Sequence, residues 1–125
     1  MSFRMNSNNE ASIALALVIL FTLLFAQHSE STTKTIRTDV YGVLTGDKYG
    51  GCMVQLGDIP SNVLDCPERW VTLDCRGLFG SRTAGHNNLN TARHALLTNS
   101  RLSVTVDDSR KVSGFCLATQ LIIFK

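Results

Sequence analysis

The sequence predicts a small, mainly β domain with one helix, cross-linked by two disulfides and exported from the cell. Three observations support this fold class. Several short segments alternate between apolar and polar residues, which is the pattern of half-buried strands. One segment late in the chain has apolar residues at helical spacing. Four cysteines follow an uncharged apolar run near the N-terminus, and an even number of cysteines in an exported chain is typical of disulfides.

The apolar run, residues 13–26, contains no charged residue and follows a short polar head. A membrane-spanning helix needs about 20 apolar residues, and this run ends sooner, at the polar QHSESTTK of residues 27–34. We therefore expect residues 1–26 to be a signal peptide, cleaved after Ala26, and the mature protein to be secreted or periplasmic and free of the membrane. Leu24 stands where such sites prefer a small residue, so an uncleaved N-terminal anchor is the alternative.

Residues 35–125 are expected to form a single domain after a flexible mature N-terminus, residues 27–34. A domain of this size buries about 60 to 70% of its unfolded surface, so disulfides should add needed stability. The formal net charge is +2 at pH 7, and the basic residues are scattered. This distribution, with few aromatic residues, argues against nucleic acid and anionic membranes as partners.

The first half of the domain is predicted to contain three strands. TIRTDVYGVL, residues 35–44, alternates along its length, and the glycine-rich turn GDKYGG leads to a second strand, CMVQL, at 52–56. After the turn GDIPSN, the third strand is RWVTLDC, at residues 69–75. We expect its Cys75 on the buried face and its Trp70 on the opposite face.

The second half is predicted to be a helix followed by two strands. The glycine-rich RGLFGSRTAGHN is expected to be a loop, and the apolar residues of NNLNTARHALLTN recur at helical spacing. Asn87 or Asn88 should cap this helix and Asn99 should end it. RLSVTVDD, residues 101–108, and GFCLATQLIIF, residues 114–124, then form two antiparallel strands around a DDSRK turn. Five strands with one helix between the third and fourth are the arrangement of an OB-like barrel, a closed sheet whose face and loops bind ligands.

The cysteines could serve as metal ligands, as nucleophiles or as disulfides. Their spacing lacks the close pairs typical of zinc sites, and pairing removes the reactive thiolate. We therefore expect two disulfides and no metal. Of the three possible connectivities, we expect Cys52 with Cys66 and Cys75 with Cys116.

Four segments, GGCMVQL, CPERWVTLDC, VTVDDSRK and SGFCLATQLIIF, resemble a group of small exported bacterial proteins. That group shares a C-P-x-x-W strand and a D-D-S hairpin ahead of a G-[FY]-C strand, and the resemblance implies no particular activity. The passage ARHALLTNSRLSVTV is more distantly similar to the binding subunits of pentameric bacterial AB5 toxins. Those subunits are OB-fold modules that dock on host glycans, but none of their sugar-contacting residues has a counterpart here.

Trp70 is the only tryptophan and is the first candidate for stacking on a sugar ring or on a partner side chain. The alternative is burial beneath the glycine-rich loop. Arg69, Arg76 and Arg82 flank the third strand and could meet an anion or serve only to keep the surface soluble.

Histidines and paired aspartates are the remaining candidates for chemistry. His86 in the predicted loop and His94 on the predicted helix could make a pH-dependent contact or lie in solvated surface. Asp107 and Asp108 could bind calcium, but no D-x-D loop surrounds them, and turn chemistry accounts for both.

The sequence contains no nucleophile elbow, paired-histidine zinc motif, phosphate loop or dinucleotide fingerprint. We therefore expect a non-catalytic binding module for a glycan or a protein, with no cofactor. The candidate ligand-binding residues are Trp70, Arg69, Arg76 and His86. The alternative is a small periplasmic inhibitor or a structural partner of an exported protein, which would insert GDKYGG or the Gly77–Gly85 loop into a cleft. An enzyme that uses His86 or His94 is a third possibility.

Overall fold

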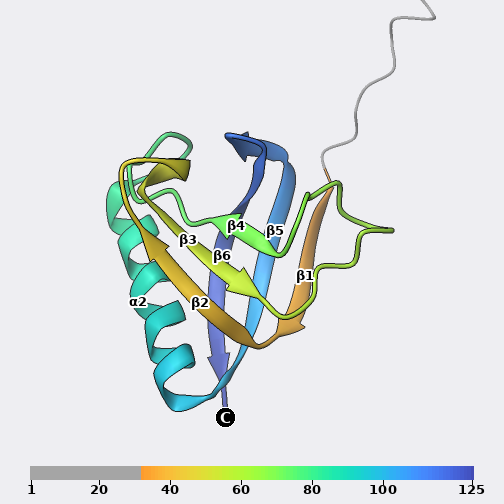
Figure 1. The fold of residues 1–125 in the computed structure, drawn as a ribbon, viewed down its shortest axis with the longest axis vertical. Helices are drawn as coiled ribbons and strands as arrows, with labels where there is room; N and C mark the ends of the chain where they lie inside the picture. The colour runs from red at the N-terminus through yellow and green to blue at the C-terminus, as the bar shows by residue number, and fades with distance from the viewer. Residues whose placement is uncertain (1–31) are drawn as a thin grey trace, which may run out of the picture.

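The computed structural model describes residues 32–125, which form one twisted sheet and one long helix (Figure 1). The predicted signal peptide, residues 1–26, lies outside the described residues, as does most of the predicted flexible segment 27–34. The first strand begins at Thr33, before the predicted start of the domain at Thr35. No helix within residues 32–125 has the length and apolar character that crossing a membrane requires.

Six strands form the sheet, and the fold is mainly β with one α-helix, as predicted. The strands are β1 (Thr33–Thr38), β2 (Val40–Thr45), β3 (Cys52–Leu56), β4 (Trp70–Thr72), β5 (Arg101–Val112) and β6 (Phe115–Phe124). A 3₁₀ turn, η1 (Tyr49–Gly51), precedes β3, and the helix α2 (Arg82–Thr98) lies between β4 and β5 in the chain. The order across the sheet is β1-β5-β6-β4-β3-β2, and only the contact between β4 and β6 is parallel.

The predicted five-stranded closed barrel needs correction, because the first predicted strand is two strands. β1 pairs with β5, whereas β2 pairs with β3, and Asp39 alone separates them in the chain. β1 and β2 are the two edges of the sheet, and no ladder joins them, so the sheet is not closed. The chain changes partner strand at Asp39, and the register of β2 with β3 shifts just afterwards, between Val40 and Gly42. Apolar and polar residues continue to alternate through this bend, so the sequence pattern could not locate the break between β1 and β2.

The core fills the space between the concave side of the sheet and α2. The helix packs against β2, β3, β5 and β6 through a buried face that includes Leu89, Ala92 and Ala95. The small alanine side chains let the helix approach the sheet closely. The largest wholly buried apolar side chains of the core are Leu56, Leu64, Leu73 and Leu102. Full burial of one such side chain contributes about 1.5 to 3 kcal/mol.

The helix begins earlier than predicted. Ser81 is its N-cap, and the Ser81 hydroxyl accepts a hydrogen bond from the amide of Ala84 at 3.1 Å. The predicted cap at Asn87 or Asn88 is therefore wrong, and so is the predicted loop from residue 82 onward. Asn99 ends the helix in the left-handed conformation, with φ of 50°, which confirms the predicted exit.

Both disulfides form, but the predicted connectivity is wrong. The pairs are Cys52 with Cys75 and Cys66 with Cys116, and no cysteine of the described chain is free. β3 and β4 are antiparallel, with Met53 opposite Thr72, so the residue that starts β3 lies near the chain just after β4. Cys75 is buried as predicted, but it lies beyond the end of β4. Two disulfides in so small a domain indicate an oxidising environment, extracellular or periplasmic.

Candidate functional site

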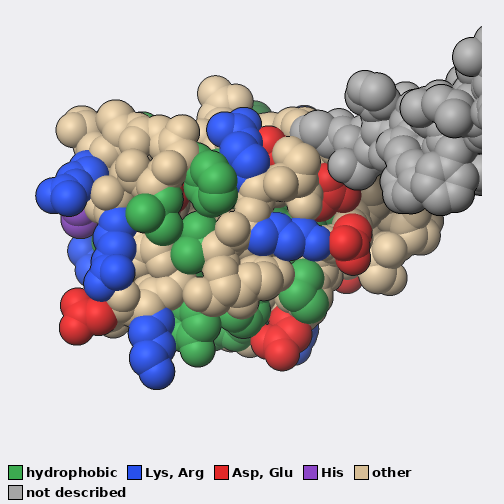
Figure 2. All heavy atoms as spheres, turned by 90° about the horizontal axis from the view of Figure 1, so that it is seen from above, with side chains coloured by type: hydrophobic (Ala, Val, Ile, Leu, Met, Phe, Trp, Pro, Cys, Tyr) green, Lys and Arg blue, Asp and Glu red, His purple; other side chains and the backbone are tan. Residues whose placement is uncertain are grey.

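One end of the sheet, uppermost in Figure 1, gathers η1, the segment after β4, the start of α2 and the turn between β5 and β6. The Tyr49 and Phe115 rings meet edge to face there, with centroids 5.3 Å apart. Figure 2 looks onto this end and shows hydrophobic side chains gathered at its centre, with Lys and Arg as well as Asp and Glu side chains around them. We call residues 76–81, between Cys75 and the helix, the apical loop.

A buried carboxylate holds the backbone of the apical loop. Asp74 is 4% exposed. Its Oδ1 accepts the Leu78 amide at 2.7 Å, and its Oδ2 accepts the Phe79 and Gly80 amides at 2.8 and 3.2 Å. The Gly77 amide also donates to the Asp74 carbonyl at 3.0 Å. Hydrogen bonds to an ionised acceptor are stronger than neutral ones, so these amides fix the shape of the loop.

Both ends of the apical loop are anchored as well. Cys75, just before the loop, is bonded to Cys52 in β3. At the other end the helix begins directly after Ser81, and the Arg82 Nε donates to the Arg76 carbonyl at 3.1 Å. The loop therefore cannot shift as a unit without breaking a disulfide or a helix cap.

Close packing against the first turns of α2 explains Gly85, which lies in the segment that the sequence analysis predicted to be a loop. A Cβ at Gly85 would lie 2.5 Å from the Asp74 carbonyl oxygen and 2.8 Å from that of Leu73. Glycine weakens a helix, and this is why the segment looked like a loop. Here it allows the helix to lie against the backbone that carries the anchoring carboxylate.

The apical loop presents its two apolar side chains to the surface. Leu78 is 60% exposed and Phe79 is 42% exposed. Phe79 also borders a pocket of about 240 Å³ between the loop, the first turns of α2 and β6, with Leu117 and Arg110 among its walls. One apolar side chain thus projects freely, and the other lies beside a small hollow.

Four of the basic groups at this end are Lys48, Arg76, Arg82 and Arg110. Lys48 and Arg82 are exposed; Arg76 is 3.7 Å from the exposed carboxylate of Asp47. The fourth basic group is Arg110, whose Nε lies 2.7 Å from an oxygen of the buried Asp107.

Asp107 fixes Arg110 beside the pocket. Burial raises the pKa of Asp107, but hydrogen bonds from Ser109 and Arg110 outweigh it and hold the pKa below its ordinary value of 3.8. The carboxylate therefore stays ionised at neutral pH. Its hydrogen bonds support an irregular stretch of β5, whose pairing with β6 shifts between Asp107 and Lys111, and they position a guanidinium near Phe79. The predicted DDSRK turn is therefore wrong, because β5 continues to Val112 and the chain turns at Ser113 and Gly114.

The structure does not bring the four predicted ligand-binding residues together. Arg76 lies in the apical loop, and His86 is exposed in the first turns of α2, where Arg82 also lies. Arg69 and Trp70 lie elsewhere, at the start of β4.

The indole of Trp70 is half-buried and lies across the outer surface of neighbouring strands. Trp70 is opposite Gln55 of β3, and its Cη2 would be 3.6 Å from a Cβ at Gly42 of β2. Beside it, the Arg69 Nη1 donates to the Gly57 carbonyl at 3.3 Å. A Cβ at Gly42 would be in ordinary van der Waals contact with the ring, so the indole covers this glycine.

Sequence reasoning missed Asp74, Leu78 and Phe79. It treated Asp74 as an outward residue of a longer strand, but β4 ends at Thr72 and Asp74 has a positive φ of 58°. A usable signal was present: DCRG, residues 74–77, has Asp at the first and Gly at the fourth position, as in a type I turn. No local signal could show that the carboxylate would also bind the amides beyond that turn.

Within residues 32–125 no group of three or more His, Cys, Asp or Glu side chains is placed to hold a metal ion. His86 and His94 are both exposed on α2. No family model matches the sequence, and no curated protein or solved structure is significantly similar to it. The two resemblances noted in the sequence therefore stay predictions, and function has to be argued from the geometry.

Proposed function

We propose that this chain is an exported, disulfide-bonded, non-catalytic module that binds a protein partner through the apical loop. One observation carries the proposal: Leu78 and Phe79 are exposed on a backbone that the buried Asp74 carboxylate holds in place. Exposed apolar groups lose contact with water only when a partner covers them, and clustered aromatic and aliphatic anchors are typical of protein interfaces.

The rigid backbone favours binding in a second way. An ordered loop loses little conformational freedom on association, whereas each mobile side chain or loop costs affinity. Hydrogen bonds from three successive amides to Asp74 order the apical loop when the protein folds. The loop is therefore prepared to enter a partner surface without rearranging.

Charge indicates the kind of partner. Lys48, Arg76 and Arg82 are exposed around the apical loop, and Arg76 lies beside the exposed carboxylate of Asp47. A complementary surface has an apolar cleft for the two loop side chains and acidic residues around it, which speed encounter and fix orientation. If that cleft is the active site of an exported hydrolase, the chain is an inhibitor, and loss of hydrolase activity on mixing identifies that case.

We also propose that the open sheet is an OB-like barrel in which β1 and β2 are the two halves of one bent strand. Three features support this: β1 and β2 are separated by Asp39 alone, the helix follows β4, and β4 and β6 are parallel neighbours. The ligand-binding loops of OB folds then correspond to η1 and the β5–β6 turn, which lie at the apical end. Export is proposed to depend on residues 1–26 as a cleaved signal peptide.

Site-specific cross-linking tests the proposed function. A photoreactive phenylalanine analogue at position 79 is expected to cross-link one defined protein in cells that make the full chain. The matched position is Leu97, which is 85% exposed and lies near the C-terminal end of α2. Equal cross-linking from positions 79 and 97, or none from position 79, contradicts the proposal.

Substitutions of the two apolar loop side chains measure how much binding energy they contribute. The double variant Leu78→Ser, Phe79→Ser should lose about 2 kcal/mol or more of binding energy, the loss typical of interface anchors. Leu97→Ser should bind like the unchanged protein. Thermal unfolding of all variants checks that the fold is retained, since both loop side chains lie on the surface.

Glycan binding at Trp70 is the second candidate, and the half-buried indole lying beside Gly42 on the sheet favours it. An indole lying along a sheet can stack on a sugar ring. Trp70 is the only tryptophan, so its fluorescence reports directly on this surface. A glycan array followed by fluorescence titration, with Trp70→Ala as the control on the array, separates this candidate from the protein-binding one.

A further inference from the structure

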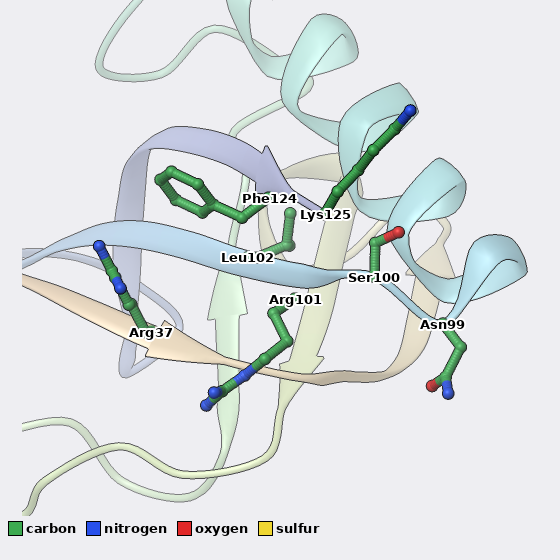
Figure 3. Close-up of a pocket in the computed structure, with 7 residues that line it drawn as sticks. All are labelled: Arg37, Asn99, Ser100, Arg101, Leu102, Phe124 and Lys125. Carbon is green, nitrogen blue, oxygen red and sulfur yellow. The ribbon is translucent and has the colours of Figure 1, made fainter.

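A second cavity lies at the other end of the molecule, where α2 ends and β5 begins (Figure 3). Its volume is about 560 Å³, which lies within the range of about 300 to 1,000 Å³ found for small-molecule sites. The residues that line it are Arg37, Asn99, Ser100, Arg101, Leu102, Phe124 and Lys125. None of them was chosen from the sequence as a ligand-binding candidate, and none of them lies in the apical loop.

The cavity is positively charged. Arg37 comes from β1, Arg101 from β5, and Lys125 follows β6, as Figure 3 shows. Among the described residues, the one ion pair recorded for these three cations joins the Arg101 Nε to Asp39 at 3.6 Å, and both side chains are more than half exposed. Such a pair contributes little and yields readily to a better placed anion.

An aromatic ring forms the apolar wall of the cavity. The guanidinium carbon of Arg37 lies 5.1 Å from the centre of the Phe124 ring, within the range of a cation–π contact. A guanidinium stacked on a ring still has its N–H edge available for an acid group. Phe124 remains 41% exposed, so part of the ring is open to a ligand.

The strand register places the two arginines within reach of one ligand. Arg37 is opposite Ser103 across the β1–β5 ladder, and Arg101 is two residues from Ser103 on the same face of β5. Such diagonal neighbours are about 7 to 8 Å apart at the backbone, a distance that two long side chains can close. Arg101 is also directly opposite Phe124 in the β5–β6 ladder.

We propose that this cavity binds a small organic acid whose carboxylate or sulfate is attached to a ring. The acid group is held between Arg37 and Arg101, and the ring of the ligand lies against Phe124. The charge requirement comes from the two arginines, which lie on neighbouring strands that line the cavity. Two guanidinium groups suit a planar or tetrahedral acid group, since each offers paired N–H donors.

Titration of the oxidised protein with simple probes tests the proposal. Benzoate and glucuronate supply a carboxylate on an aromatic ring and on a sugar ring, and inorganic sulfate supplies an acid group alone. We expect the ring acids to shift the backbone amide NMR signals of Arg37, Arg101 and Phe124, and sulfate to bind more weakly. The stronger of the two ring acids identifies the source of the ligand. Equal shifts with benzyl alcohol or glucose, which are neutral, overturn the proposal.

Four variants complete the test. Arg37→Gln and Arg101→Gln should each weaken binding of the ring acid about tenfold or more, because each removes a charge-assisted hydrogen bond. Phe124→Leu should weaken the ring acids and leave sulfate unchanged. Arg93→Gln, on the exposed face of α2, is the control and should bind normally. The proposal is overturned if the control loses as much affinity as the cavity variants, or if the cavity variants lose none.

Discussion

Two loops of this protein place their leucine side chains in opposite directions. The loop between β3 and β4, residues 57–69, turns Ile59 and Leu64 into the core, where Leu64 is 1% exposed. The apical loop turns Leu78 and Phe79 outward. Both loops belong to the same small domain, and they differ in whether these side chains pack in the core or lie at the surface.

The two loops are also held in different ways. The long loop is fixed mainly by its own buried side chains and by the Cys66–Cys116 disulfide. Asp65 adds an ion pair of 2.8 Å with Lys111 and a hydrogen bond of 3.1 Å from its amide to the Asp108 carboxylate. The apical loop is fixed through its backbone, by a carboxylate that lies outside it. A loop anchored by its backbone keeps its side chains free for a partner, and the predictions below test this distinction.

Removing the disulfides should have the largest effect. The double substitution of Cys66 and Cys116 by Ala opens a loop with a sequence separation of 50, and that of Cys52 and Cys75 one of 23. From chain entropy we expect losses of about 4 and about 3 kcal/mol in the free energy of unfolding. Urea unfolding followed by Trp70 fluorescence measures both. Limited proteolysis should cut residues 57–69 first in the former variant, and cleavage in the apical loop instead would break the comparison.

Truncation of one leucine from each loop compares the two directly. Leu64→Ala should cost about 3 kcal/mol of unfolding free energy, because it leaves a cavity in the core. Leu78→Ala should change stability by about 0.5 kcal/mol or less, as expected for a surface residue. Similar losses from both, in the same urea experiment, would mean that the apical loop also supports the core.

Asp74→Asn tests the backbone anchor. Asn tolerates the positive φ of 58° at this position, so the substitution removes the charge without straining the chain. We expect a loss of about 1 to 3 kcal/mol in stability and weaker cross-linking from position 79. Asp47→Asn, an exposed carboxylate at the same end, is the matched control and should change stability by less than about 1 kcal/mol. Unchanged amide exchange at Leu78 and Phe79 in Asp74→Asn would count against the anchor.

Acid should give the smallest effect. The folded-state pKa of Asp107 lies below its ordinary value of 3.8, so its contribution to stability is complete above that value and is lost as pH falls through the folded-state pKa. Unfolding measurements from about pH 6 to about pH 2.5 should show a shallower decline at the acid end for Asp107→Asn. Identical pH profiles for the variant and the unchanged protein would show that Asp107 does not contribute in this way.

The sequence predicted those parts of the fold that depend on local pattern. Alternation located most strands, helical spacing located α2, and Asn99 ended the helix as expected. The last two strands pair as predicted, but their turn lies at Ser113 and Gly114 and not in DDSRK. Local pattern failed where a distant contact overrides a local preference. Gly85 was predicted to lie in a loop. It lies inside α2, at a position where only a glycine fits against the Asp74 carbonyl.

The candidate site was predicted only in part. Arg76 and His86 were chosen for their chemistry and lie at the apical end, but the residues that carry the proposed interface, Leu78 and Phe79, lie in a segment that was noted only as a glycine-rich loop. From sequence alone, two adjacent apolar residues in a short loop are equally consistent with burial in the core and with exposure at the surface. Its exposure follows from the position of Asp74, which depends on how β4 ends against η1.

The sequence by itself determined that this is a mainly β domain with one helix and four cysteines suited to disulfides, because side-chain periodicity and cysteine number are properties of the local chain. Only the tertiary structure decided that Cys52 joins Cys75, since that pairing depends on which strand ends meet when β3 packs beside β4. The tertiary structure likewise decided that the sheet stays open and that one loop faces the core while the other faces solvent. These features depend on how residues that are far apart in the sequence pack together in the core, so no local sequence pattern predicts them.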